Sequence, residues 1–173
     1  MSLIKKQSIK NQGGLILVIL ALCILFTILN TTFINGANLM NIIRQASVNI
    51  IVVMGVSIIM IAGELDLSVA GVACLTGMIV SRIMVAGVSI WAAILIGLVL
   101  GAAIGLLNGF LTTRFKLSSM IITLAVNSAC TGFASLVTGG TAVYGLPKSF
   151  EFLGRGTILK IPTQVIVMAV IVS

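Results

Sequence analysis

Long apolar runs dominate this chain of 173 residues and leave few folds open to it. A helix that crosses a bilayer needs about 20 mostly apolar residues. Runs of this kind, complete or partial, recur along the chain: Gly14–Phe33, Val48–Ala62, Leu67–Val85, Ile90–Leu107, Met120–Val137 and Ile161–Ser173. Only 8% of the residues are charged, against roughly 25% in soluble domains. We therefore predict an all-α fold: a polytopic membrane helix bundle of about five spans plus the start of a sixth.

The N-terminal run follows three lysines and has the general layout of a signal peptide. It is longer than the apolar core of a signal peptide, about 7–15 residues, so we expect a retained first helix. The next stretch, Asn35–Ser47, mixes polar and apolar residues and predicts a short amphipathic helix or an interfacial lead into the second span. Val48–Val85 then forms two crossings or, less simply, one broken crossing.

Composition excludes several kinds of function. The net charge of +7 comes from cations that flank apolar runs, so it indicates contact with membrane lipid and not with nucleic acid. Cys23, Cys74 and Cys130 lie inside apolar runs without metal-ligand spacing and are interpreted as small buried residues. The chain has no histidine and no nucleophile–base pattern. We expect no catalytic residue, metal or cofactor.

Two carboxylates stand out between the second and third apolar runs. Glu64 and Asp66 are the only acidic residues before Glu151, and charge at membrane depth usually faces a protein interior or a water-filled path. In one interpretation the chain is broken at 63–68 and lines a cavity, with Asp66 and Ser68 capping the next helix and contacting solute. In the other, Gly63, Glu64, Asp66 and Ser68 form an ordinary turn with helix capping. Proton coupling is a third possibility.

Later runs carry two further patterns. Gly97, Gly101, Gly105 and Gly109 recur every fourth residue and predict close packing of one helix against another. Thr123, Asn127 and Thr131 also share one helical face. Their neutral hydrogen-bonding groups suit a path for a polyhydroxyl solute, although hydrogen bonding between helices is the commoner role. Candidate path residues are thus Asp66, Ser68, Thr123 and Asn127.

The C-terminal part begins with a 23-residue connection, 138–160, rich in turn-forming residues. It predicts either a surface loop that receives a partner or a plain linker. The last apolar run has 13 residues, too few to cross a bilayer. We therefore expect the chain to be the first part of a longer protein or an incomplete reading frame.

Five short motifs, in order and at matching spacing, resemble the permease subunits of ribose-type ABC importers. This family also carries other monosaccharides and the autoinducer-2 signal. The motifs are Asn41–Asn49, Ala62–Val69, Gly105–Gly109, Thr138–Gly140 and Gly145–Pro147. The sequence departs from the family pattern where Glu64 replaces a glycine, Leu65 an isoleucine and Ala70 a glycine. Further departures are Ser118, Met120 and Ala125.

The resemblance implies that residues 1–173 are the N-terminal part of a single permease transmembrane domain whose C-terminal half is absent. It implies a multi-pass protein of the bacterial inner membrane that pairs with a second permease subunit, identical or not. A cytoplasmic ABC ATPase would hydrolyse ATP, and an extracytoplasmic solute-binding protein would deliver a sugar or sugar-like solute. Two alternatives remain: a proton- or ion-coupled secondary transporter using Glu64 and Asp66, and a non-transporting truncated remnant.

Overall fold

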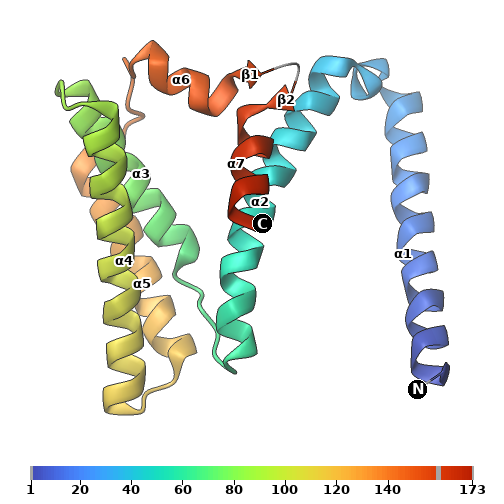
Figure 1. Ribbon diagram of the computed structural model, residues 1–173, viewed down its shortest axis with the longest axis horizontal. Coiled ribbons are helices and arrows are strands. Elements are labelled where there is room, and N and C mark those ends of the chain that lie inside the picture. The colour runs from blue at the N-terminus through green and yellow to red at the C-terminus, as the bar shows by residue number, and fades with distance from the viewer. Residues whose placement is uncertain (1, 159–160, 173) are drawn as a thin grey trace. The chain divides into compact units, whose positions relative to one another are not determined.

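The computed structural model describes residues 2–158 and 161–172, with side chains from residue 13 onward. Internal contacts divide the chain into two compact units, Met1–Ala46 and Ser47–Ser173. Figure 1 shows that nearly all of the described chain is helical. This agrees with the predicted all-α class.

The first unit contains α1, Ser2–Leu29, and the 3₁₀ helix η1, Thr31–Ile34. The predicted span continued to Phe33, but α1 ends before Asn30. Asn30 stops the helix because its side-chain oxygen accepts a hydrogen bond from the Thr32 amide at 2.9 Å, which starts the tighter turn. The rings of Phe26 and Phe33 then meet across this corner with centroids 5.9 Å apart.

The second span and the stretch before it form one helix, α2, Gly36–Ile61. Of the two expectations for Asn35–Ser47, the separate amphipathic helix was therefore wrong, and the stretch leads directly into the second span. The polar side chains of this stretch punctuate the apolar pattern, but no proline interrupts it and nothing at residues 47–48 removes a backbone hydrogen bond. A change in side-chain polarity alone does not end a helix.

Three helices form the core of the second unit: α3, Val69–Val85; α4, Ile90–Phe115; and α5, Ser119–Thr138. They run alongside one another in Figure 1, and α3 contacts both of the others. Buried Leu75 of α3 packs there with Cys130 and Ala134 of α5. Cys130 is buried as predicted, while Cys23 and Cys74 are only partly so.

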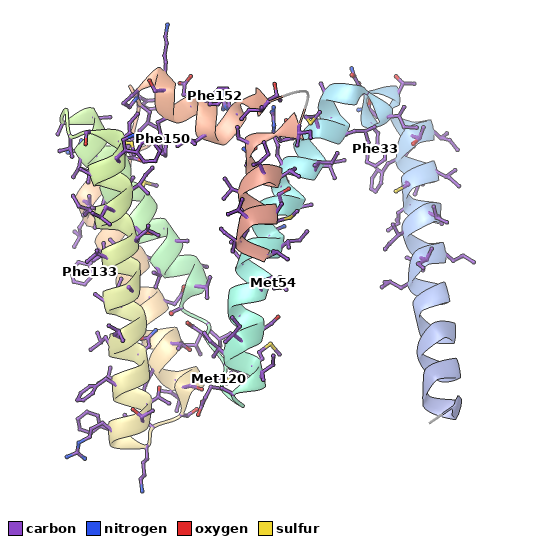
Figure 2. The ribbon with its side chains drawn as sticks, in the orientation of Figure 1. Phe33, Met54, Met120, Phe133, Phe150 and Phe152 are labelled. Carbon is purple, nitrogen blue, oxygen red and sulfur yellow. The ribbon has the colours of Figure 1, made fainter. Side chains whose placement is uncertain are left out.

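The outer surfaces of these helices are apolar. Phe133 projects outward from the group (Figure 2) and Trp91 is 77% exposed within the chain. Among the described residues, α2, α4 and α5 are long and apolar enough to cross a membrane. Gly13–Leu29, Val69–Val85 and Thr163–Val172 are shorter apolar helical stretches. Large exposed apolar surface on long helices is what a multi-pass membrane protein requires, because lipid replaces water around it.

The connection after α5 is partly helical and not a plain loop. It contains α6, Lys148–Arg155, followed by two short antiparallel strands, β1, Thr157–Ile158, and β2, Ile161–Pro162. The last apolar run begins its helix, α7, at Thr163 and continues to Val172. Thr163 ties α7 to α6 because its hydroxyl donates to the Leu153 carbonyl at 2.8 Å.

Candidate functional site

The N-terminus of α3 lies well inside the helix group. Ser68, which precedes it, is bonded to Asn108, seven residues before the end of α4. Gly71 is bonded to Asn127, eight residues after the start of α5. At 1.5 Å of rise per residue, these contacts lie about 10–12 Å in from the helix ends. The chain therefore reaches α3 through a non-helical segment, residues 62–68, inside the depth of the neighbouring helices.

Figure 1 shows the course of this segment. The lower end of α2 turns at residues 62–63, the chain rises without helical structure, and α3 continues upward. Gly63 allows the reversal because its φ of +84° belongs to the left-handed region that glycine adopts without strain. The interruption predicted at 63–68 is present, and it divides two antiparallel helices.

Asn127 caps α3 from the neighbouring helix. The amide of Gly71, in the first turn of α3, donates to Asn127 Oδ1 at 2.7 Å. A side chain at the N-cap usually accepts this kind of hydrogen bond. Ser68 occupies the N-cap position, but its side chain makes no capping bond. The capping oxygen thus comes from α5, and the Ser68 hydroxyl is available for other contacts.

Gly71 makes this contact possible. A Cβ at position 71 would lie 2.5 Å from the backbone oxygen of Asn127 and 2.9 Å from its Cα. Only a residue without a side chain lets the two helices approach this closely. Sequence analysis did not single out Gly71, although it follows the acidic segment directly and lies on a helix that must start inside the bundle.

Asp66, Ser68 and Asn108 form a chain of hydrogen bonds. Asp66 Oδ1 accepts from the Ser68 amide at 2.7 Å and from the Ser68 hydroxyl at 2.6 Å. The single hydroxyl proton of Ser68 is used in this bond, so Ser68 Oγ can only accept from Asn108 Nδ2, at 2.9 Å. This fixes the amide orientation of Asn108.

The opposite end of the Asn108 amide has no such partner. Asn108 is 6% exposed, and among the described residues its Oδ1 lacks a hydrogen bond. Buried polar atoms are normally paired, and an unpaired one costs about 1–3 kcal/mol. Asn108 Oδ1 is therefore a buried acceptor whose partner does not lie in the described part of the chain.

A cavity of about 250 Å³ adjoins this chain. Glu64, Asp66, Asn108 and Thr123 are among the residues that line it, and the wall also includes Ile59 at the end of α2. A second cavity of about 250 Å³ shares Asp66 and Gly105 with the first and includes Ser68. The hydrogen-bonded chain therefore borders both spaces.

The four predicted glycines have two different surroundings. A Cβ at Gly97 would come within 2.6 Å of Val80 Cγ2, and one at Gly101 within 3.9 Å of Thr76 Cγ2. Positions 105 and 109 have open space and lie along the first cavity. The N-terminal half of the pattern packs against α3, while the C-terminal half leaves room beside the acidic segment.

The polar face of α5 is likewise divided. Asn127 contacts α3, as described above, and Thr123 is 3% exposed beside the cavity with its hydroxyl bonded to the Ser119 carbonyl at 2.8 Å. Thr131 is exposed and bonds its own helix. Ser119 adds a contact that sequence analysis missed, since its hydroxyl accepts from the Leu65 amide at 3.3 Å.

Comparison with known proteins gives these features a context. Residues 38–172 match the family described as "Branched-chain amino acid transport system / permease component". The ribose import permease protein of Bacillus subtilis (strain 168) is 33% identical over 164 residues, which are 94% of this chain and 51% of that protein. No solved structure gives a significant match.

Other relatives carry related names. The L-arabinose ABC transporter permease protein of Azospirillum brasilense is 29% identical over 151 residues, 87% of this chain and 44% of its own length. The D-allose transport system permease protein of Escherichia coli (strain K12) is 33% identical over 135 residues, 78% and 41% of the two chains. The chain spans about half the length of these relatives or somewhat less. Because the family match covers residues 38–172, the chain belongs to this family of transport-system permease components, and the sugar permeases named above are its relatives.

Proposed function

We propose that this chain is the N-terminal part of the transmembrane domain of an ABC importer permease for a sugar or sugar-like solute. The observation that carries the proposal is the alignment of 94% of the chain with a ribose import permease. The arabinose and allose permeases support the same solute class. Similarity to several sugar import permeases favours this function over an ion-coupled transporter and over a remnant that transports nothing.

The mechanism we propose is alternating access. A loaded solute-binding protein docks on the outer face, and ATP binding by a cytoplasmic ATPase rearranges two permease subunits around a shared path. The chain itself would lie in the bacterial plasma membrane and hydrolyse nothing. Its α3 starts inside the depth of the neighbouring helices, and transporters place helix ends of this kind beside their solute.

The residues proposed to border the path are Asp66, Ser68 and Thr123, which line the cavities at the start of α3. Asn127 contributes indirectly, because it holds α3 in position through the Gly71 amide. Neutral hydroxyl and amide groups at this depth suit an uncharged, hydroxyl-rich solute, whose hydroxyl groups need partners once water is left behind.

Native mass spectrometry of the protein, gently extracted from its own membrane, tests the proposal. We expect a complex that contains paired permease subunits and two ATPase subunits. A species of 18.0 kDa that carries no ATPase would contradict the importer function. Uptake driven by a proton gradient, and abolished by Glu64→Gln, would instead support the ion-coupled alternative.

A further inference from the structure

The short helix α6 lies crosswise at one end of the helix group. Figure 1 shows it directed across the run of α4, α5 and α7, beside the end where α5 finishes and α7 begins. The start of α4 lies at this same end, because only residues 116–118 separate α4 from α5 and the two helices are antiparallel. When its neighbours cross a membrane, a helix placed in this way runs along the membrane surface.

Hydrogen bonds fix the direction of α6 relative to α7. Besides the bond of the Thr163 hydroxyl described above, the Thr163 amide donates to the Gly156 carbonyl at 3.2 Å. Gln164 Nε2 donates to the Gly154 carbonyl. Gly156 closes the turn, because a Cβ at this position would collide with the Phe152 carbonyl. The two helices therefore form one rigid corner, and a bilayer that takes up the apolar α7 has α6 lying along its surface.

The two faces of α6 differ in polarity. Lys148, Glu151 and Arg155 follow the helical spacing of three and four residues, so they share one face, and all three are exposed. Phe150 and Leu153 are three residues apart and share the opposite face. A charged face that includes cations, opposite a face of aromatic and aliphatic residues, is typical of helices that lie between headgroups and acyl chains.

The single tryptophan and the single tyrosine of the chain lie at the same end. Trp91 is the second residue of α4 and is 77% exposed, and Tyr144 precedes α6 and is 82% exposed. On α6 itself, Phe152 is 50% exposed. Tryptophan and tyrosine are enriched at the membrane–water interface, because each has an apolar ring and one polar group. These side chains therefore indicate the level of the membrane surface.

Cations gather at this level as well. Arg82 lies in the last turn of α3, which ends just before α4 begins. Lys148 and Arg155 lie on α6, with one carboxylate, Glu151, between them in the sequence. The net charge of these groups is positive, and cations near a membrane surface are attracted to anionic lipids. The charge at this end is therefore complementary to anionic phospholipid headgroups.

We propose that α6 is an interfacial helix that binds the headgroup region of the membrane and prefers anionic phospholipids. Its apolar face contacts the upper acyl chains, and its charged face contacts phosphate groups and water. Through the corner with α7, the helix sets the depth at which α7 enters the membrane. The inference depends only on the membrane location of the chain and holds for any solute.

Tryptophan fluorescence in lipid nanodiscs measures the depth of α6. Trp91 of the unmodified chain is one probe, and Phe152→Trp in a Trp91→Phe background is the other. Phosphatidylcholine brominated close to the headgroup should quench both probes more than phosphatidylcholine brominated close to the acyl-chain ends. Leu106→Trp in the same background is the matched control and should show the reverse order. Leu106 is 76% exposed and lies about 24 Å along α4 from its first residue.

Three results would overturn the interfacial position of α6. One is equal quenching of the probe at position 152 by the two brominated lipids. Another is the order of quenching that the Leu106→Trp control shows. The third is a probe at position 152 that neither lipid quenches. If aqueous acrylamide then quenches this probe, α6 lies in water as a surface for a protein partner.

The preference for anionic lipid is measured with the same probe at position 152. One set of nanodiscs contains brominated phosphatidylglycerol in unlabelled phosphatidylcholine, and the other contains brominated phosphatidylcholine in unlabelled phosphatidylglycerol. The first set should quench more strongly, and Lys148→Gln should lower the ratio of the two by up to about 5-fold. Lys116→Gln is the matched control, because Lys116 follows the last residue of α4 at the opposite end. An unchanged ratio in Lys148→Gln, or an equal fall in both variants, overturns the preference.

Discussion

Replacement of Gly71 by alanine is the sharpest test of how α3 is held. The new Cβ would lie 2.5 Å from the Asn127 backbone oxygen, a separation that real Cβ atoms do not adopt, so one helix must move. Overpacking of this kind costs about 1–3 kcal/mol. The movement also weakens the hydrogen bond from the Gly71 amide to Asn127 Oδ1, and hydrogen bonds between membrane helices average about 0.6 kcal/mol.

Gly77 supplies the matched control on the same helix. A Cβ at position 77 meets nothing within 4 Å, so Gly77→Ala only gains helix propensity, about 1 kcal/mol. Gly71→Ala gains the same propensity, and the difference between the two variants isolates the packing term. We expect Gly71→Ala to be less stable than Gly77→Ala by about 2–4 kcal/mol.

The assay is thermal unfolding of the purified protein in detergent. The expected difference corresponds to midpoints about 5–15 °C apart for a chain of this size. Equal midpoints for the two variants would refute the close approach of α3 and α5. A double variant strengthens the test. Asn127→Ser shortens the side chain but keeps the backbone oxygen that the new Cβ meets. The double variant should therefore be no more stable than Gly71→Ala alone.

Three further predictions use the same measurement. Asn127→Ala should lower the free energy of unfolding by about 0.5–2 kcal/mol because it leaves the Gly71 amide without its cap. The control Thr131→Ala, on the exposed side of α5, should change it by less than about 0.5 kcal/mol. Similar losses in both variants would contradict the capping role. Asp66→Ala should cost about 1–3 kcal/mol by leaving the Ser68 amide and hydroxyl unpaired, and Asp66→Asn should recover most of this because it keeps an acceptor oxygen. Gly97→Ala should lower the unfolding midpoint because its Cβ would meet Val80 at 2.6 Å. Gly109→Ala should leave the midpoint unchanged or raise it. A lower midpoint for Gly109→Ala than for Gly97→Ala would show that the glycine pattern packs elsewhere.

Much of the fold follows from local sequence. Runs of apolar residues long enough to cross a bilayer predicted the membrane class and most helices, because every backbone group there must be bonded within its own segment. The interruption at 63–68 was also predictable, since two carboxylates and a glycine separate two apolar runs. The ends of the helices were harder to predict. Asn30 ended α1 early, and α2 included most of Asn35–Ser47 despite its polar residues.

Tertiary structure decided the roles of individual side chains. Ser68 and Asn108 are 40 residues apart in sequence, and Gly71 and Asn127 are 56 apart. No local pattern specifies such pairs, because they depend on how far α3 extends into the helix group. This depth made Asn127 the cap of α3, freed Ser68 to join Asp66 to Asn108, and left Gly105 and Gly109 beside a cavity. The sequence alone determined that the chain forms membrane helices with an acidic interruption, because hydropathy acts residue by residue. What that interruption contacts was determined by packing between helices that are distant in sequence.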